Sequence, residues 1–548
     1  MVSAEESAAA AAEAEASDRG RIAKAAAIIM VGTILSRLLG LGREQISSWL
    51  FGTGDPIAAF TIADNIQTIL YNLVMSGMME AALVPVLTAY AVPELRQELR
   101  RIVGALLVLA LIVIGAAVVL MEIFAPAVVV VMTAIGGDPG AHGAATLALT
   151  LTLVRMILPA VLLLALSTIL MSTLYALHRF ARPAMSLAVR NAAVVVTALV
   201  LGGTAFGVRS LALGLVIGAA LLFALMLPGL RDALPRPNLD FHHPAVRRIL
   251  ALYLPIAIGL VSNTVALVID RNLAWGAGPN ALGGMRYATT LNQLILGIVA
   301  AATSLAALPT LSRHFNNGDE DAYQRTLANG LKMVTVMVVP ATFGMAAIAW
   351  PTVDLLFFHG ATTLAGAQAI LVALLGYLPG TFFAAFDQVL IFGYYARQNT
   401  TKPVVVGVIA VGVYLAVALP LVHPLGMLGL VLANSAQFTF HALAMWWLMH
   451  HDLGRVGDAT VGRTIRVAVA VGVVMAAAVF ALARAIEGVP LAALALTPGG
   501  SVPHRLAAVA LPVAVGAAVY VAGLHLFGVD EVRTIQRGLS RRLGRAAR

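Results

Sequence analysis

Two arginines stand in an otherwise apolar stretch near the start of the chain, and the chemistry they offer is anion binding. Arg37 and Arg43 lie within a predicted helix over residues 22–50. A guanidinium keeps its charge and can bond two phosphate or carboxylate oxygens at once, whereas an unpaired charge inside hydrocarbon is costly. The pair is therefore a candidate for holding an anionic group in a cavity. The alternative is a structural ion pair of Arg43 with Asp64 or Glu80, or an arginine that reaches the lipid headgroups.

Glycines beside these arginines allow the helix to bend. Along an ideal helix the two arginines lie about 9 Å apart and roughly 120° around the axis, so a straight helix would not direct both to one cavity. Gly40 and Gly42 permit a kink or an unwound turn that could.

Two further predicted spans carry polar side chains at helical spacing. On the second span these are Asp64, Gln67 or Thr68, Tyr71, Asn72 and Met75, and on the eighth they are Arg286, Thr289, Thr290 and Gln293. A polar helix face should not contact lipid, so we expect both faces to line a cavity, and we add Arg155 of the fourth span. Three intramembrane carboxylates, Asp64, Glu80 and Asp387, are candidates for binding a coupling proton.

Motifs of soluble enzymes are lacking from the sequence. It contains no Walker loop, GxSxG, HExxH or Gly-rich dinucleotide fingerprint, and it contains no cysteine, which excludes thiol catalysis and disulfides. We predict no catalytic residue, no metal and no cofactor. A membrane glycosyltransferase would generally need a large catalytic loop outside the membrane, and none is predicted, so transport that is facilitated or ion-coupled is favoured.

The elements that position these side chains are membrane-spanning helices. The 548 residues are 60% hydrophobic and 11% charged, with a mean hydropathy of +0.92. A bilayer crossing takes about 20 mostly apolar helical residues, and only helices or closed barrels satisfy their own backbone in lipid. About fourteen spans qualify: 22–50, 57–90, 102–132, 144–177, 184–203, 210–229, 249–275, 284–312, 328–350, 364–395, 404–422, 427–449, 464–485 and 505–527.

The basic residues predict the orientation of these spans. Most of the 35 Lys and Arg residues fall in one set of alternate loops, which places both termini in the cytoplasm. The same bias argues against nucleic-acid binding, because the excess charge of +9 lies on one membrane side and not in one basic domain. Residues 1–20 are expected to be a disordered cytoplasmic tail without signal-peptide character. Residues 529–548 form a basic cytoplasmic tail, either an amphipathic helix on anionic headgroups or a solvated segment.

The sequence repeats itself at an offset near 220 residues. Tyr175–Pro183 resembles Tyr395–Pro403, and Glu80–Pro85 resembles Ser304–Pro309 at an offset of 224. We therefore predict two parallel lobes of about six helices each, facing one another across a central cavity. The predicted domains are an N-lobe (21–232), a cytoplasmic linker (233–246), a C-lobe (247–452) and a terminal helix pair (453–528) outside the repeat.

At this point the motifs resemble those of a known family, the MurJ (MviN) lipid II flippases of the multidrug/oligosaccharidyl-lipid/polysaccharide exporter superfamily. The resemblance rests on Ser36–Glu44, Phe51–Gly54, Ser76-Gly77 through Val84–Leu87, Phe358–Gly360 and Gly393–Pro403. It implies alternating access by two lobes, with a hydrophobic groove from spans 13 and 14 holding a polyprenyl tail. It also implies that lipid II, an undecaprenyl-diphosphate-linked peptidoglycan precursor, moves from the cytoplasmic to the periplasmic leaflet of the bacterial inner membrane.

The family pattern matches this chain in part. Arg37, Arg43 and Arg155 match basic positions of the family, but Ala58-Ala59-Phe60 stands where the family has Asp-Ala-Phe. Tyr71-Asn72, Ser76 and Thr290 replace two basic positions, an acid and an arginine. Arg286, one turn before Thr290 on the same face, is a possible compensation. Span 11 offers no carboxylate or Asn for a sodium site.

The sequence thus predicts a lipid II flippase with Arg37 and Arg43 on the diphosphate. The alternatives are a flippase for another polyprenyl-linked glycan and a proton-coupled exporter of small amphiphiles. The expected partners are the lipid-linked glycan and membrane lipids, including anionic headgroups, and a monomer is the simplest assembly.

Overall fold

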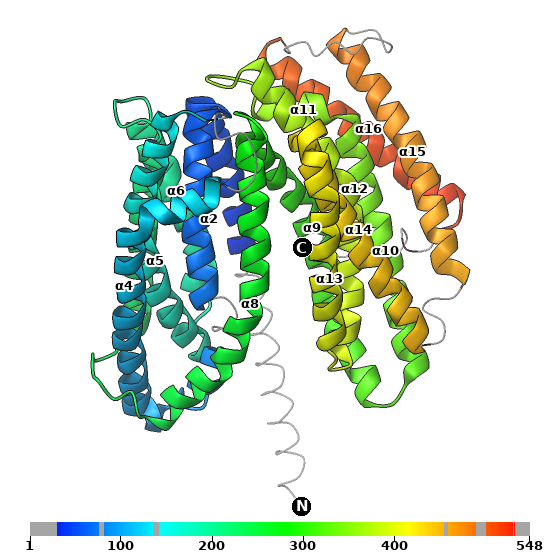
Figure 1. Cartoon of the computed structure of the whole chain (residues 1–548). Helices are drawn as coiled ribbons and strands as arrows, with labels where there is room; N and C mark the ends of the chain where they lie inside the picture. The colour runs from blue at the N-terminus through cyan, green and yellow to red at the C-terminus, as the bar shows by residue number, and fades with distance from the viewer. Residues whose placement is uncertain are drawn as a thin grey trace, which may run out of the picture. The chain divides into compact units, whose positions relative to one another are not determined.

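The computed structural model describes residues 30–75, 82–134, 142–453, 459–488, 500–529 and 531, and in this part of the chain the long regular elements are all helices (Figure 1). Among these described residues, ten helices are long and apolar enough to cross a membrane. The predicted class, an all-α membrane protein, is confirmed, and the count of about fourteen spans stays a prediction. The predicted N-terminal tail and Glu80 lie outside the described residues, and of the predicted C-terminal tail only Val529 and Glu531 are described.

Close contacts divide the chain into two compact units. The N-terminal unit takes the described residues up to Asn272, except for Gly52–Gly54, and the C-terminal unit takes Gly52–Gly54 and the residues from Leu273 onwards. The predicted domain bounds follow the sequence repeat and not the contacts, and they stay a prediction.

The N-terminal unit is built around one central helix. Its elements are a helix over residues 30–51, α2 (Asp55–Met75), α3 (Val84–Thr88), η2 (Pro93–Leu95), α4 (Arg96–Thr133), α5 (Ala144–Ala176), α6 (Ala181–Leu201), α7 (Arg209–Met226), η3 (Leu227–Leu230) and α8 (Pro244–Gly276). The central helix is α5, which packs against α2, α4 and α7. Its buried hydroxyls bond within the helix, as Ser167 does to the Leu163 carbonyl at 2.6 Å. These local bonds let polar residues lie in an apolar interior.

The C-terminal unit has the same kind of centre. It contains α9 (Ala281–Asn316), α10 (Glu320–Ala347), α11 (Ala349–Leu356), α12 (Leu364–Ala396), α13 (Thr401–Leu425), α14 (Met427–Leu453), α15 (Ala459–Glu487) and α16 (Val502–Leu526). Here α12 is central and packs against α9, α10 and α14. The orange α15 and red α16 lie side by side in Figure 1, and both pack against α10.

The two central helices correspond residue for residue. Each is 33 residues long, each contains one proline, Pro159 or Pro379, and their bounds differ by 220 throughout. Both end in the same turn: His178 has φ 58° and Gln398 has φ 57°. The backbone N–H of the next residue then bonds back to the helix, at 2.8 Å from Arg179 to the Leu174 carbonyl and at 3.0 Å from Asn399 to that of Tyr394. The first sequence match is therefore a match of backbone structure.

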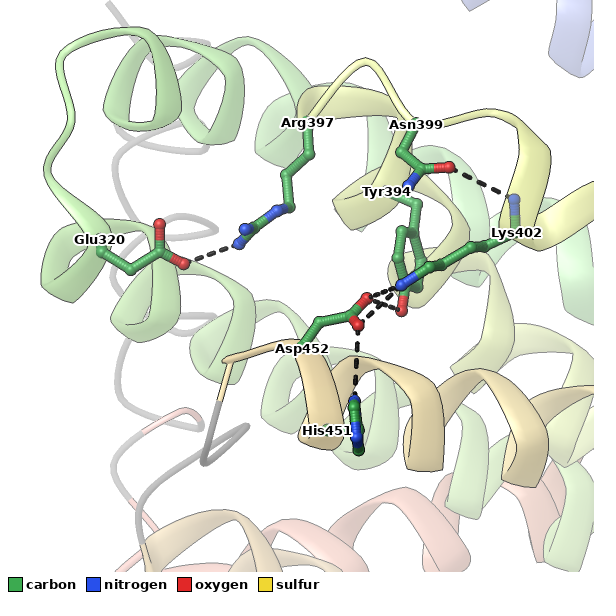
Figure 2. Close-up of polar contacts among 7 residues, drawn as sticks. All are labelled: Glu320, Tyr394, Arg397, Asn399, Lys402, His451 and Asp452. Carbon is green, nitrogen blue, oxygen red and sulfur yellow. Dashed lines mark hydrogen bonds and ion pairs between the residues drawn. The ribbon is translucent and has the colours of Figure 1, made fainter.

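An ion pair stabilises each of these two turns. After α12, Lys402 pairs with Asp452 at 2.6 Å, and Asp452 also accepts a hydrogen bond of 2.8 Å from the Tyr394 hydroxyl (Figure 2). After α5, Arg179 donates two hydrogen bonds, of 2.6 and 2.7 Å, to Asp232. Hydrogen bonding to Arg179 holds the pKa of the Asp232 carboxylate at about 2, below its ordinary 3.8.

Candidate functional site

Arg43 is held between its own helix and α6. Its side chain is half-buried, and its Nη2 lies 2.6 Å from Oε1 of Glu44, which is 2% exposed. Its Nη1 donates to Oδ1 of Asn191 at 3.4 Å, and Nδ2 of Asn191 donates to the Ser36 carbonyl at 3.1 Å. A Cβ on Gly40 would lie 3.4 Å from that Nδ2, so the glycine allows the close approach. The acid beside Arg43 is thus Glu44, and not the predicted Asp64.

A second arginine, Arg190 of α6, joins this site, and our sequence reasoning did not select it. Arg190 interacts electrostatically with three groups: Arg43, Asp64 and Tyr71. Its Nε is buried and has no hydrogen-bond partner among the described residues. The rule that selected Arg43, a charge inside an apolar span, applies equally to Arg190 and would have found it.

Gly218 of α7 provides the space for Arg190. A Cβ at this glycine would lie 3.1 Å from Cγ of Arg190 and 3.0 Å from its carbonyl oxygen. The side chain of Arg190 therefore packs against α7, and this contact restricts where the guanidinium group can lie.

Tyr71 and Asn72 of α2 have different surroundings. The Tyr71 hydroxyl lies 2.8 Å from Oγ1 of Thr168 on α5. Because Thr168 donates its own proton to the Leu164 carbonyl at 3.0 Å, Tyr71 is the donor of this bond. Asn72 is exposed. We call Arg43, Glu44, Asp64, Tyr71 and Arg190 the arginine cluster.

The sequence also predicts Arg155 and Arg37 as site residues of the N-terminal unit. Arg155 is half exposed, at 51%, and its Nε lies 4.0 Å from Oε2 of Glu122 on α4. Arg37 is half-buried and has an interaction partner. No described contact brings Arg155 into the arginine cluster.

In the C-terminal unit the predicted polar face lies on α9. Thr290 donates its hydroxyl proton to the Arg286 carbonyl at 3.2 Å, as expected for residues one helical turn apart. Arg286 is half-buried and Gln293 is exposed. Their role in binding stays a prediction.

The carboxylate predicted on α12 has a partner that the sequence did not reveal. Asp387 is buried, and its Oδ2 lies 2.7 Å from Nδ1 of His441 on α14. This ion pair joins two helices of the C-terminal unit.

An apolar groove of about 750 Å³ opens on the C-terminal unit. Its walls come from α10, α12 and α15, and none of its lining residues is charged. The aromatic side chains that line it are Phe343, Phe382, Phe383 and Phe480. Helix α16 packs against α15, and Met475 and Val479 of α15 lie close to Gly516 of α16.

The arrangement suits the binding of an anion. Two guanidinium groups that interact inside an apolar helical unit repel each other, and an anion between them would relieve the repulsion. Arg43 uses three N–H groups on Glu44 and Asn191 and has five. Among the described residues, no group of three His, Asp or Glu could hold a metal ion.

The helices, the buried charges and the apolar groove together define a polytopic membrane transporter. A profile of the family "Lipid II flippase MurJ" matches residues 47–495, and the chain belongs to this family. Because the family consists of flippases, the chain is a transporter and not an enzyme.

Curated relatives agree with this assignment. The chain is 27% identical to "Lipid II flippase MurJ" of Burkholderia cenocepacia, over 76% of this chain and 81% of that protein. It is 28% identical to "Probable lipid II flippase MurJ" of Vibrio cholerae, over 78% of this chain and 83% of that protein.

Solved structures share the fold. "Lipid II flippase MurJ, inward closed conformation" matches with a TM-score of 0.75 and 19% identity, over 92% of this chain and 99% of that chain. An inward-facing multidrug resistance MATE family transporter of the MOP superfamily matches with a TM-score of 0.66 and 14% identity, over 76% of this chain and 94% of that one.

Proposed function

We propose that this protein is a flippase that moves lipid II from the cytoplasmic to the periplasmic leaflet by alternating access. Membership of the MurJ family supports the substrate. The contact of Arg43 with Asn191, the residue directly after Arg190, is the observation that carries the chemistry, because it brings two arginines of different helices together. A diphosphate cannot cross hydrocarbon bare, and guanidinium groups are its natural ligands because their N–H forks bond pairs of oxygens.

In this proposal the arginine cluster binds the diphosphate. Arg43 and Arg190 supply the positive charge, and Arg37 adds to it from one to two turns earlier in the first helix. Asp64 and Tyr71 lie beside the arginines and contact the sugar. Arg155, Arg286, Thr290, Gln293 and Asn72 are assigned to later positions of the headgroup along its path.

The polyprenyl tail lies in the apolar groove of α10, α12 and α15. A chain of isoprene units is purely hydrocarbon, and a groove without charged lining residues suits it. The headgroup and the tail are thus handled by separate surfaces, so that the tail never has to leave an apolar environment.

The topology proposed for this function has about fourteen spans in two six-helix lobes, with spans 13 and 14 added. The protein lies in the bacterial inner membrane with both termini in the cytoplasm, and it acts as a monomer. Arg463 and Arg466 line a pocket of about 360 Å³ with Phe527, which suits an anionic lipid headgroup.

The test is flipping of labelled lipid II in proteoliposomes by the wild type, Arg43→Ala and Arg190→Ala. We expect both variants to lose flipping, while Arg209→Ala, an exposed arginine at the start of α7, keeps it. Normal flipping by both cluster variants would overturn the assigned site. Failure of the wild type to complement a flippase-depleted strain, despite correct insertion, would redirect the substrate to another polyprenyl-linked glycan.

A further inference from the structure

A buried acid–base pair lies in the C-terminal unit, apart from the residues assigned to the headgroup. The side chains of Asp387 and His441 are only 7% and 13% exposed, and Nδ1 of His441 lies 2.7 Å from Oδ2 of Asp387. The other carboxylate oxygen, Oδ1, is buried and has no hydrogen-bond partner among the described residues. A charge so placed in an apolar unit requires a functional or structural reason.

The imidazole of His441 connects three helices. Besides Asp387 on α12, it interacts with the main chain of Pro403 on α13. Its Nε2 faces α13, because a Cβ on Gly407 of that helix would lie 3.7 Å from it. Nδ1 lies at ion-pair distance from the Asp387 carboxylate without a hydrogen bond of good geometry, so the attraction of opposite charges favours the imidazolium form of His441.

Two charged groups on the surrounding helices, Lys402 and Arg397, have ion-pair partners of their own. The groups resolved as acting on Asp387 and His441 are each other and the main chain of Pro403. Lys402 of α13 pairs with Asp452 of α14 at 2.6 Å, and Arg397 pairs with Glu320 at 2.7 Å. The remaining titratable side chains on the helices packed against α12, α13 and α14 are Arg286, Tyr287, Arg313, His314, Asp321, Tyr323, Arg325, Lys332, Asp354, Tyr377, Tyr394, Tyr395, Tyr414, His423, His450 and His451.

We propose that Asp387 and His441 form the proton-binding site that couples transport to a proton gradient. With the proton bound, His441 is an imidazolium beside the Asp387 carboxylate. When one proton leaves to water, the neutral imidazole keeps its other N–H and the ion pair is lost. The charge of the pair falls from zero to minus one, which is costly in a buried position.

The proton state therefore controls how tightly α13 is held to α12 and α14. Protonation favours the packed arrangement, and release favours an arrangement in which water reaches the pair. In the exchange cycle one proton enters from the periplasmic side and leaves to the cytoplasm as one lipid moves outward. This inference deepens the proposed function and depends on it for the identity of the lipid.

The first experiment measures the equilibrium distribution of labelled lipid II between leaflets under an imposed gradient of one pH unit. One coupled proton per lipid shifts the distribution about tenfold in the wild type. We expect the shift to vanish in Asp387→Asn and His441→Gln, and to persist in Asp387→Glu, which keeps a carboxylate. His423→Gln, which removes an exposed histidine of α13, is the matched control and should keep the shift. A tenfold shift in both Asp387→Asn and His441→Gln would overturn the proposal.

A second measurement needs no substrate and separates the two proposals. Trp446 of α14 packs against Phe386 of α12, the residue before Asp387, with ring centroids 5.5 Å apart and the ring planes tilted by 46°. We expect a pH-dependent fluorescence change that is absent from Trp446→Phe and from His441→Gln, in variants that keep the gel-filtration profile and melting temperature of the folded protein. If the wild type moves no lipid II but shows this change, the proposed substrate fails and the proton site stands. The same pH dependence in folded His441→Gln would overturn the proton site.

Discussion

The two units share a scaffold but bury different charges on it. Position 167 of α5 is a serine whose hydroxyl bonds within its own helix, and the corresponding position of α12 is Asp387, which needs His441 from α14. Conversely, Arg190 and Asn191 of α6 correspond to Ala410 and Val411 of α13. A duplicated backbone thus carries the arginine cluster in one unit and an acid–base pair in the other.

This difference teaches that equivalent helices can specialise without changing their packing. A hydroxyl satisfied inside its helix makes no demand on a neighbour, whereas a buried charge requires a partner on another helix. Substitution of a few positions is then enough to place different buried charges on the same backbone.

The largest expected effect is on headgroup binding in the N-terminal unit. Arg190→Ala should weaken binding of lipid II at least about thirtyfold, because truncating one member of a buried charged site typically costs about 2–5 kcal/mol. Asp387→Asn should leave binding unchanged at zero pH gradient. Quenching titrations of labelled lipid II against both variants measure this, and an equal loss in both would break the comparison.

A smaller effect is expected from Glu44→Gln. Removing the buried carboxylate takes away the negative charge that offsets the repulsion between Arg43 and Arg190. The free energy of unfolding of the protein without ligand should therefore fall by about 1–3 kcal/mol. Lipid II should then stabilise this variant more than it stabilises the wild type. Melting temperatures with and without the lipid measure the difference, and equal stabilisation of the two proteins would contradict the assigned role of the cluster.

The turn after α5 predicts a pH dependence. The pKa of Asp232 is lowered from 3.8 to about 2, so its ionised form adds stability that is present above pH 3.8 and is lost as pH falls through about 2. Asp232→Asn should therefore be less stable than the wild type at pH 7, and the difference should shrink steadily as pH falls from 3.8 towards 2. Unfolding followed by helical circular dichroism across this range checks the sign, and a difference that is as large at pH 2 as at pH 7 would refute it.

The smallest effect concerns the turns that the two units share. His178→Gly and Gln398→Gly should each stabilise the protein by about 1 kcal/mol or less, because glycine adopts positive φ without the cost that a side chain carries. Similar gains in both variants would support the equivalence of the turns. Destabilisation of only one of them would show that its side chain has a further role.

Much of the site could be recognised from the sequence because a charge in an apolar helix is conspicuous. This criterion selected Arg43, Asp64 and Asp387, and it would have selected Arg190 had it been applied to the sixth span. Helical spacing also placed Tyr71 and Asn72 on one face, but Tyr71 contacts α5 while Asn72 is exposed. Spacing gives the angle around a helix and does not say which neighbour lies at that angle.

The sequence by itself determined the class of protein, the helices and their duplication. Each membrane helix satisfies its backbone within its own segment, so composition along the chain is enough to find it. Only the tertiary structure decided that Arg190 joins Arg43, that Asp387 meets His441, and that α10, α12 and α15 line the groove. These contacts join residues far apart in the chain, and they depend on how side-chain ridges of neighbouring helices interlock, which no local pattern records.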